Sequence, residues 1–215
     1  MEFLYLDKRV AVCLKPSGVL STDEPGGMPT LIREALNEPK GCVRTVHRLD
    51  RVVGGVMVFA RSVRAASELS AQVRGDDFQK NYLAVVHGTP ESARGTFTDL
   101  LLRDTARRMT LVVSEPQKGA QEAVLDYETL SSKDGLSLVR VNLRTGRTHQ
   151  IRVQFSSRGL PLVGDKKYGR AEDDCTIALW SHALSFRHPE SGEPLSFSAP
   201  PPAVLPWTIF DAQLH

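Results

Sequence analysis

The sequence predicts an α+β fold built on a mixed, largely antiparallel β-sheet with a few flanking helices. Apolar and β-branched runs of strand length recur along the chain, and most are bounded by Gly, Pro, Asp or Ser. Few segments show the three-to-four-residue spacing of an amphipathic helix. Strands and helices also lack the regular β-α-β alternation of a parallel sheet, which favours antiparallel pairing.

Ten runs are expected to form strands, and they are spread over almost the whole chain. In order they are residues 3–6, 10–14, 56–60, 82–86, 96–102, 110–113, 123–130, 136–143, 177–185 and 195–198. The ESGEP segment, residues 190–194, predicts the loop of a late hairpin. The prolines at residues 200–202 are expected to begin a C-terminal tail.

Two segments are typical of helices, and a third is ambiguous. Ser62 can cap a helix that runs to Gly75, and residues 30–37 predict a shorter helix before Pro39. Residues 148–158 alternate in part like a strand, but Gly159 and the proline after it would end a helix, so we expect a helix there. The apolar positions of the first helix are Val63, Ala66, Leu69 and Val73.

Length and composition indicate a folded globular protein. A chain of 215 residues can bury a core without disulfides or metals, so we expect a single domain over residues 1–215, with two small domains as the alternative. The hydrophobic fraction of 41% and the charged fraction of 24% are ordinary for such proteins. Composition alone therefore excludes disordered and fibrous classes and leaves function open.

Charge is more informative in its distribution than in its sum. The net charge is only +2, yet no carboxylate occurs between Asp134 and Asp165. The basic groups in that interval are Arg140, Arg144, Arg147, His149, Arg152 and Arg158. This pattern favours a surface that faces phosphate, and the competing interpretation is a solvated basic face.

No metal or organic cofactor is expected. The three cysteines lie far apart, and the histidines lack the close spacing of metal-ligand helices. The segment GLPLVGDK, residues 159–166, places Asp165 where a phosphate-binding loop has its lysine. The first residues carry acids and no apolar run, and no stretch has the length of a membrane span, so a cytoplasmic location is expected.

Three polar segments are candidates for chemistry. HRLD, residues 47–50, precedes an expected strand and presents Asp50 among arginines. KNYLA, residues 80–84, places Lys80 and Tyr82 on one face if it is extended, which suits a ring that stacks on a base. GRTHQIR, residues 146–152, is too polar for a core and suits contacts with phosphate and ribose. Each segment alone fits a structural role as well.

Together, in this order, the three segments resemble the signature of the RluA-type pseudouridine synthase family. The resemblance extends from FLYLD (residues 3–7) and LKPSGV (14–19) through LVGDKKYG (162–169) to SHA (181–183) and HP (188–189). It implies the pseudouridine synthase fold with a central RNA-binding cleft. It also implies isomerisation of a uridine in RNA, in which the N1 glycosidic bond breaks and the base rejoins the sugar through C5.

The resemblance also implies roles for individual residues. Asp50 matches the essential aspartate, which acts as a nucleophile or stabilises the sugar during base release. Arg152 matches the arginine that pairs with that aspartate, and Tyr82 matches the tyrosine that stacks on the base and can accept a proton. Arg48 matches the residue that enters the RNA stack in place of the flipped uridine. The other expected substrate contacts are His47, Lys80, Arg147, His149 and Ile151.

The chain also departs from the family pattern. Val53 and Gly54 stand where the family has Thr and Ser, so two hydroxyls that could fix the turn behind Asp50 are missing. Gln154 stands where a histidine is frequent, and Leu14 where Asn or Asp is common. These differences bear on rate and target more than on the type of reaction.

The expected partner is RNA, either a ribosomal RNA or a transfer RNA stem-loop, bound by a monomer without a separate N-terminal RNA-binding domain. Two other classes of function remain open from the sequence. One is a non-catalytic RNA-binding protein on the same fold. The other is a glycoside or nucleoside hydrolase, which would need a second carboxylate close to Asp50.

Overall fold

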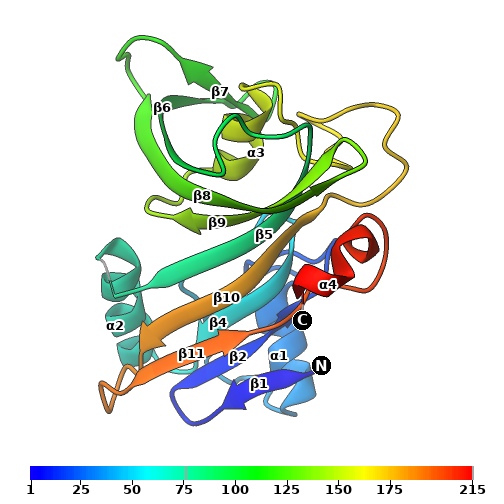
Figure 1. Ribbon diagram of the computed structural model, residues 1–215. Coiled ribbons are helices and arrows are strands. Elements are labelled where there is room, and N and C mark those ends of the chain that lie inside the picture. The colour runs from blue at the N-terminus through cyan, green and yellow to red at the C-terminus, as the bar shows by residue number, and fades with distance from the viewer. Residues whose placement is uncertain (76, 215) are drawn as a thin grey trace. The chain divides into compact units, whose positions relative to one another are not determined.

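The computed structural model describes residues 1–75 and 77–214 and divides the chain into two compact units (Figure 1). Unit 1 comprises Met1–Lys80 and Ser181–Ala199, and unit 2 comprises Asn81–Trp180 and Pro200–His215. Each unit is therefore assembled from two stretches of chain that are distant in sequence. The single domain expected over residues 1–215 stays a prediction.

Unit 1 is built on antiparallel strands. Strand β2 (Val10–Lys15) pairs with β1 (Phe3–Leu6) on one side and with β4 (Gly54–Ala60) on the other. The two-residue strand β3 (Arg44–Thr45) also pairs with β4. Strand β10 (Leu179–Arg187) follows β4 in the sheet order and pairs with β11 (Pro194–Ser198). In the register of β2 and β4, Lys15 lies opposite Gly55, so the end of β2 lies beside the start of β4.

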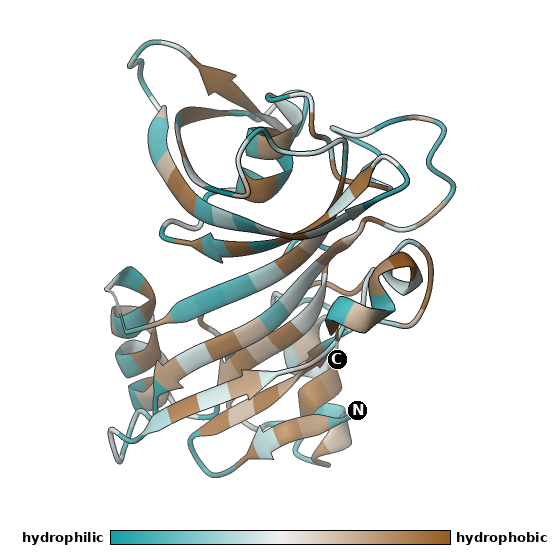
Figure 2. Cartoon of the chain, in the orientation of Figure 1, coloured by the Kyte–Doolittle hydropathy of each residue, from teal (hydrophilic) through white to brown (hydrophobic). Residues whose placement is uncertain are grey.

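Two helices belong to unit 1. Helix α1 is Met28–Ala35, and helix α2 is Val63–Arg74. The Ser62 hydroxyl caps α2 by accepting the backbone N–H of Ala65 at 3.1 Å, as the sequence predicted. Helix α2 turns Ala65 and Leu69 into a core shared with the strands, and hydrophobic residues gather along β2 and β4 (Figure 2). Ala66 and Val73 of the predicted apolar face also pack against this core, whereas Val63 is 63% exposed.

Unit 2 contains a five-strand order, β5-β9-β8-β6-β7. These strands are β5 (Gln79–His87), β6 (Arg94–Asp104), β7 (Met109–Val113), β8 (Gln121–Lys133) and β9 (Leu136–Leu143). The pairings of β5 with β9, of β9 with β8, of β8 with β6 and of β6 with β7 are all antiparallel. Helix α3 (Gln150–Ser156) begins after His149, whose φ of 56° is left-handed.

The C-terminal segment corrects one expectation. We expected a tail from residue 200, but Trp207–Phe210 forms a 3-10 helix, and Asp211–Leu214 forms the short helix α4. Trp207 and Phe210 are buried in a cluster with Leu83, Val85 and other apolar residues of unit 2. The sequence did not predict these helices, because the three prolines indicate only where the preceding strand ends. They carry no information on what the aromatic residues after them contact.

The predicted fold class is confirmed, because the sheet is mostly antiparallel and helices are few. All ten expected strands form: β1 and β9 have the predicted bounds, β10 is shifted towards the C-terminus, and the others are longer than predicted. The ambiguous segment at residues 148–158 is helical, as expected, but only over Gln150–Ser156. Strand β3 was not predicted, because two residues are too few for a pattern. Across the described residues, no helix has both the length and the apolar character needed to cross a membrane.

Candidate active site

Asp50 lies in a turn of unit 1 that leads directly into β4. The backbone N–H of Val53 donates to the carbonyl oxygen of Asp50 at 2.9 Å, which closes the turn over residues 50–53. Asp50 is partly exposed to solvent. Strand β4 begins directly after this turn, at Gly54, and all of its residues are buried.

The preceding loop, residues 15–21, fixes this turn from the other side. The hydroxyl of buried Ser21 donates to the carbonyl of Leu49 at 2.9 Å and accepts the N–H of Leu49 at 3.1 Å. Ser17 donates its hydroxyl to the carbonyl of Val52 at 2.6 Å. Two hydroxyls from another part of the chain thus hold the turn, in a protein that lacks the Thr-Ser pair after Asp50.

Lys15 contributes a third attachment. Its side chain is fully buried, and its Nζ donates to the carbonyls of Pro16 (2.9 Å), Val19 (2.6 Å) and Arg51 (3.1 Å). Burial lowers the pKa of Lys15 to about 8, while the Asp50 carboxylate opposes this shift and the charge of Arg51 adds to it. A positive charge is therefore held within electrostatic reach of Asp50.

His47 and Lys80, also in unit 1, differ in exposure, because His47 is buried and Lys80 is partly exposed. His47 is buried, packs its ring on Phe78 at 5.2 Å and accepts the N–H of Val58 on Nε2 at 3.2 Å. Burial, together with the charge of Lys80, lowers the pKa of His47 to about 3. The ring is thus a neutral packing element beneath the HRLD segment, whereas Arg48 is exposed to solvent.

Tyr82 and the GRTHQIR segment belong to unit 2. Tyr82 lies on β5 and is 5% exposed, and Ile151 on α3 is 4% exposed. Arg147 is exposed and donates its Nε to the carbonyl of Glu122 at 2.9 Å. Side chains were predicted to alternate between two faces of β5. Leu83, on one face, joins the core of unit 2, and Ala84, on the same face as Tyr82, is also buried.

Arg152 projects from α3 into a buried ion pair with Asp165. Its Nε donates to Oδ2 at 2.7 Å and an Nη donates to Oδ1 at 2.6 Å, so the contact is bidentate. Burial alone would raise the pKa of Asp165. The Arg152 guanidinium and the N–H groups of Lys167 and Tyr168 outweigh burial, so the pKa lies below its ordinary value. The carboxylate consequently fixes the plane of the guanidinium.

A second contact in unit 2 orients His149. The Tyr168 hydroxyl accepts the N–H of Thr110 at 2.7 Å and lies 2.7 Å from Nδ1 of His149. This contact holds the His149 ring through Nδ1. The Tyr168 ring also lies 5.2 Å from the Arg152 guanidinium carbon.

The structure therefore groups the expected residues by unit. His47, Arg48, Asp50 and Lys80 lie in unit 1, and Tyr82, Arg147, His149, Ile151 and Arg152 lie in unit 2. Reasoning from individual residues missed three supports, namely Lys15, Asp165 and Tyr168. The signal for Asp165 and Tyr168 was their place in LVGDKKYG, one of the segments that carry the family resemblance.

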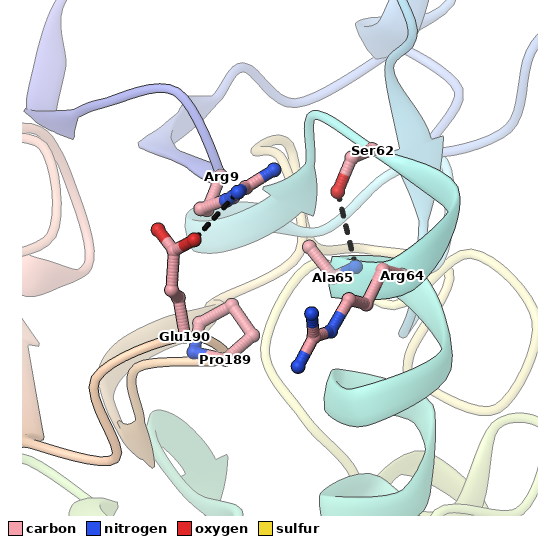
Figure 3. Close-up of a pocket in the computed structure, with 6 residues that line it drawn as sticks. All are labelled: Arg9, Ser62, Arg64, Ala65, Pro189 and Glu190. Atoms are coloured by element: carbon pink, nitrogen blue, oxygen red, sulfur yellow. Dashed lines mark hydrogen bonds and ion pairs between the residues drawn. The ribbon is translucent and has the colours of Figure 1, made fainter.

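A shallow pocket in unit 1 lies apart from these residues (Figure 3). Arg9, Arg64, Pro189 and Glu190 line it together with the start of α2, and it has room for little more than a water molecule. It cannot accept a nucleotide. Within residues 1–75 and 77–214, no three His, Cys, Asp or Glu side chains are grouped as a metal site would need.

Comparisons with known proteins agree with the motifs. A family model described as RNA pseudouridylate synthase matches residues 9–157. The uncharacterized RNA pseudouridine synthase YlyB of Bacillus subtilis is 34% identical over 213 residues, which cover 94% of this chain and 69% of the relative. The dual-specificity RNA pseudouridine synthase RluA of Pasteurella multocida is 33% identical, over 94% of this chain and 93% of the relative.

Solved structures agree on the fold. The human RNA pseudouridylate synthase domain containing 4 matches with a TM-score of 0.78 and 23% identity, over 93% of this chain and 88% of that one. At this identity the likeness concerns the fold alone. The family model and the sequence relatives carry the assignment further: this chain belongs to the RluA-type family of RNA pseudouridine synthases, which are isomerases.

Proposed function

We propose that this protein converts a uridine in structured ribosomal or transfer RNA to pseudouridine, with Asp50 as the catalytic aspartate. The observation that carries the assignment of Asp50 is its rigid turn. Backbone groups on both sides of the acid are held by Ser21, Lys15 and Ser17, and β4 begins immediately afterwards. Such preorganisation keeps a nucleophile in reacting geometry and lowers the entropic part of the barrier.

The choice of RNA is supported by two relatives. The Pasteurella multocida protein is named as dual-specific, and a relative from Xanthomonas campestris, 33% identical over 95% of this chain, is named ribosomal large subunit pseudouridine synthase D. The basic interval between Asp134 and Asp165 adds positive charge for the phosphate backbone. A looped RNA would reduce the cost of extruding the uridine, which is about a few kcal/mol.

The chemistry assigns different work to the three catalytic residues. The Asp50 carboxylate attacks the sugar or assists elimination of a sugar proton as the N1 glycosidic bond breaks. Tyr82 stacks on the released uracil and accepts a proton as C5 joins the sugar. Arg152, whose guanidinium is oriented by Asp165, supplies positive charge to an anion in the site. The pairing of Arg152 with Asp50 that the family resemblance implies stays a prediction.

The proposed substrate contacts differ in their exposure to solvent. Arg48 and Arg147 are exposed and suit contacts with RNA, and His149 is oriented by Tyr168. Ile151 would line the pocket for the base. Lys80 is partly exposed and suits a contact with RNA, whereas the buried His47 ring binds the N–H of Val58, so we propose that it acts on the substrate through the shape of the HRLD segment.

The test uses purified full-length protein and total RNA from cells that lack its gene. Chemical mapping of pseudouridine should show one or more uridines converted by the wild type. Asp50→Asn, which keeps the size of the side chain, should bind the same RNA with at least about a 10³-fold loss of conversion, because the nucleophile is gone.

Other outcomes separate the alternatives. RNA binding without conversion by the wild type would favour a non-catalytic RNA-binding protein. Release of free uracil would indicate a hydrolase. Conversion by Asp50→Asn at the wild-type rate would contradict the assignment of Asp50 while leaving the family activity in place.

A further inference from the structure

Carboxylates compensate much of the positive charge between Asp134 and Asp165. Most arginines of this interval bind an acid from β6, from β8 or from the loop after α3, at distances of 2.6 to 3.0 Å. The pairs are Arg140–Glu128, Arg144–Asp126, Arg152–Asp165 and Arg158–Asp99. An RNA backbone would therefore meet more uncompensated charge elsewhere in unit 2.

A second group of basic residues lies on the hairpin of β6 and β7 and on the loop beside it. Arg103 is near the end of β6, Arg107 and Arg108 lie in the loop that joins the strands, and Lys167 lies in the loop after α3. All four residues are exposed, and we call them the hairpin surface. The Asp104 carboxylate lies among them, 3.8 Å from Nε of Arg107. Four cations beside this acid leave a net positive charge that is open to solvent.

Hydrogen bonds gather the hairpin surface on one part of unit 2. Lys167 donates Nζ to the carbonyl of Arg108 at 2.8 Å. Arg103 lies opposite Thr110 in the register of β6 and β7, and the N–H of Thr110 donates to the Tyr168 hydroxyl at 2.7 Å. The loop after α3 is thus attached to β7 at two points, and it brings Lys167 beside the arginines of the hairpin.

The same loop orients Arg152. Asp165 binds the Arg152 guanidinium, and the Tyr168 ring lies 5.2 Å from the guanidinium carbon. Burial raises the pKa of Tyr168, while the charges of Arg152 and Arg103 oppose that rise, so both cations lie within electrostatic reach of its ring. The loop of the hairpin extends from the body of unit 2 (Figure 1). RNA bound beside Arg152 would therefore have the hairpin surface within reach.

The loop of the hairpin has an arginine where the backbone favours glycine. Arg108 is the last residue before β7 and has a φ of 53°, which is left-handed. Glycine adopts this conformation at a lower cost than arginine. The Asp104 carboxylate accepts the N–H of Arg107 at 2.9 Å and supports the turn without the side chain of Arg108. The turn gains nothing from this arginine, which favours a role for its guanidinium in binding.

We propose that the hairpin surface is an RNA-binding arm, which binds phosphates of the substrate next to the uridine that is isomerised. The inference rests on the proposed function, because it takes RNA as the substrate. Guanidinium groups match the geometry of phosphate, and each phosphate that is neutralised releases counterions. The arm should therefore add affinity and salt dependence. It touches no reacting atom, so it should leave the chemical step unchanged.

The test compares full-length wild type with Arg107→Gln/Arg108→Gln on total RNA from cells that lack the gene. Filter binding at roughly 50–300 mM KCl measures the affinity and its salt dependence. The double variant should bind about 10-fold more weakly at low salt, and its plot of log affinity against log salt should be flatter by about 1.4–1.8, as the loss of two phosphate contacts predicts. The single-turnover rate constant at saturating protein should stay within twofold of the wild type.

Two further double variants serve as controls. Arg107→Lys/Arg108→Lys keeps both charges and should retain most of the affinity. Arg94→Gln/Lys133→Gln removes the same charge from exposed residues at the start of β6 and the end of β8, and its affinity should stay within twofold of the wild type. Equal weakening by this control would overturn the proposal, because total charge would then explain the effect. So would wild-type affinity in Arg107→Gln/Arg108→Gln, or a rate constant lowered more than 10-fold.

Arg108→Gly covers the case in which the double variant folds poorly. Glycine relieves the left-handed backbone at this position, so the urea midpoint of unfolding should not fall, while RNA affinity should fall about threefold. Wild-type affinity in a folded Arg108→Gly would contradict the arm. A wild type that binds RNA through these arginines but converts no uridine would end the proposed function and support the arm, which distinguishes the two failures.

Discussion

At the scale of single residues, the pair formed by Arg152 and Asp165 shows how burial changes the value of a charge. Both side chains are almost fully buried, with 5% and 0% exposed. Removing charges from water is costly, and only bidentate contact with further hydrogen bonds to the carboxylate offsets that cost. Asp165 has both, because the N–H groups of Lys167 and Tyr168 also donate to it.

Asp165→Asn should therefore lower the free energy of unfolding by about 3–5 kcal/mol at pH 7, because it removes the charge that the buried Arg152 guanidinium binds in a bidentate contact. The pKa of Asp165 is lower in the folded than in the unfolded chain, so its stabilisation is complete above the ordinary pKa of 3.8. It is lost as the pH falls through the lower folded value. Urea denaturation at several pH values measures the difference between the two proteins, which should narrow below pH 3.8.

Asp126→Asn is the matched control for this prediction. Asp126 makes a similar contact with Arg144, but those side chains are 30% and 60% exposed. Solvent screens the pair, so its loss should cost no more than about 1 kcal/mol. Equal losses in the two variants would show that burial does not decide the value of the Arg152 pair.

At the scale of elements, the approach of β4 to β10 depends on a residue without a side chain. Gly55 has a φ of 126°, and a Cβ there would lie 2.3 Å from the carbonyl oxygen of Ser181. Ser181 also donates its hydroxyl to the carbonyl of Val56 at 2.9 Å. This close contact fixes the start of β4 and, with it, the turn that carries Asp50.

Gly55→Ala should lower the free energy of unfolding by about 2–4 kcal/mol, since the left-handed conformation and the overpacking against the Ser181 backbone both add cost. Chemical denaturation followed by circular dichroism measures the loss. Gly192→Ala is the control, because Gly192 also has a positive φ, of 74°, but its Cβ would meet nothing within 4 Å. If both variants lost the same free energy, steric contact with β10 would have no part in the result.

At the scale of the whole molecule, segments that are far apart in sequence share one core within a unit. The core of unit 1 combines residues of β2, β4 and α2 with Leu184 and Phe186 of β10. Along the chain, the Asn81–Trp180 stretch of unit 2 separates the two stretches of unit 1. The core of unit 1 is therefore complete only when both stretches are in place.

Leu184→Ala should lower the free energy of unfolding by about 2–5 kcal/mol, because Leu184 is 0% exposed and its loss leaves a cavity among strands from both stretches. Leu205→Ala is the control, since Leu205 is 66% exposed, and it should change stability by less than about 0.5 kcal/mol. Urea titration of both variants tests this. A small effect at Leu184 would mean that β10 contributes little to the core.

The sequence by itself determined the mostly antiparallel sheet, the cap of α2 at Ser62 and the family. Periodicity, turn residues and caps act within about ten residues, so they can be read from a single chain. Motifs such as HRLD and GRTHQIR identify chemistry in the same way, because each is a local set of side chains. The roles of Asp50, Tyr82 and Arg152, the expected monomer and the cytoplasmic location stay predictions.

Only the tertiary structure decided which groups meet. It showed that hydroxyls of Ser17 and Ser21 hold the turn behind Asp50, that Asp165 binds Arg152, and that Trp207 belongs to a core rather than a tail. It also showed that the His47 ring is buried and binds the N–H of Val58. Contacts between distant residues depend on the register of strands and on the packing of both partners, and neither is encoded in the spacing of a local pattern.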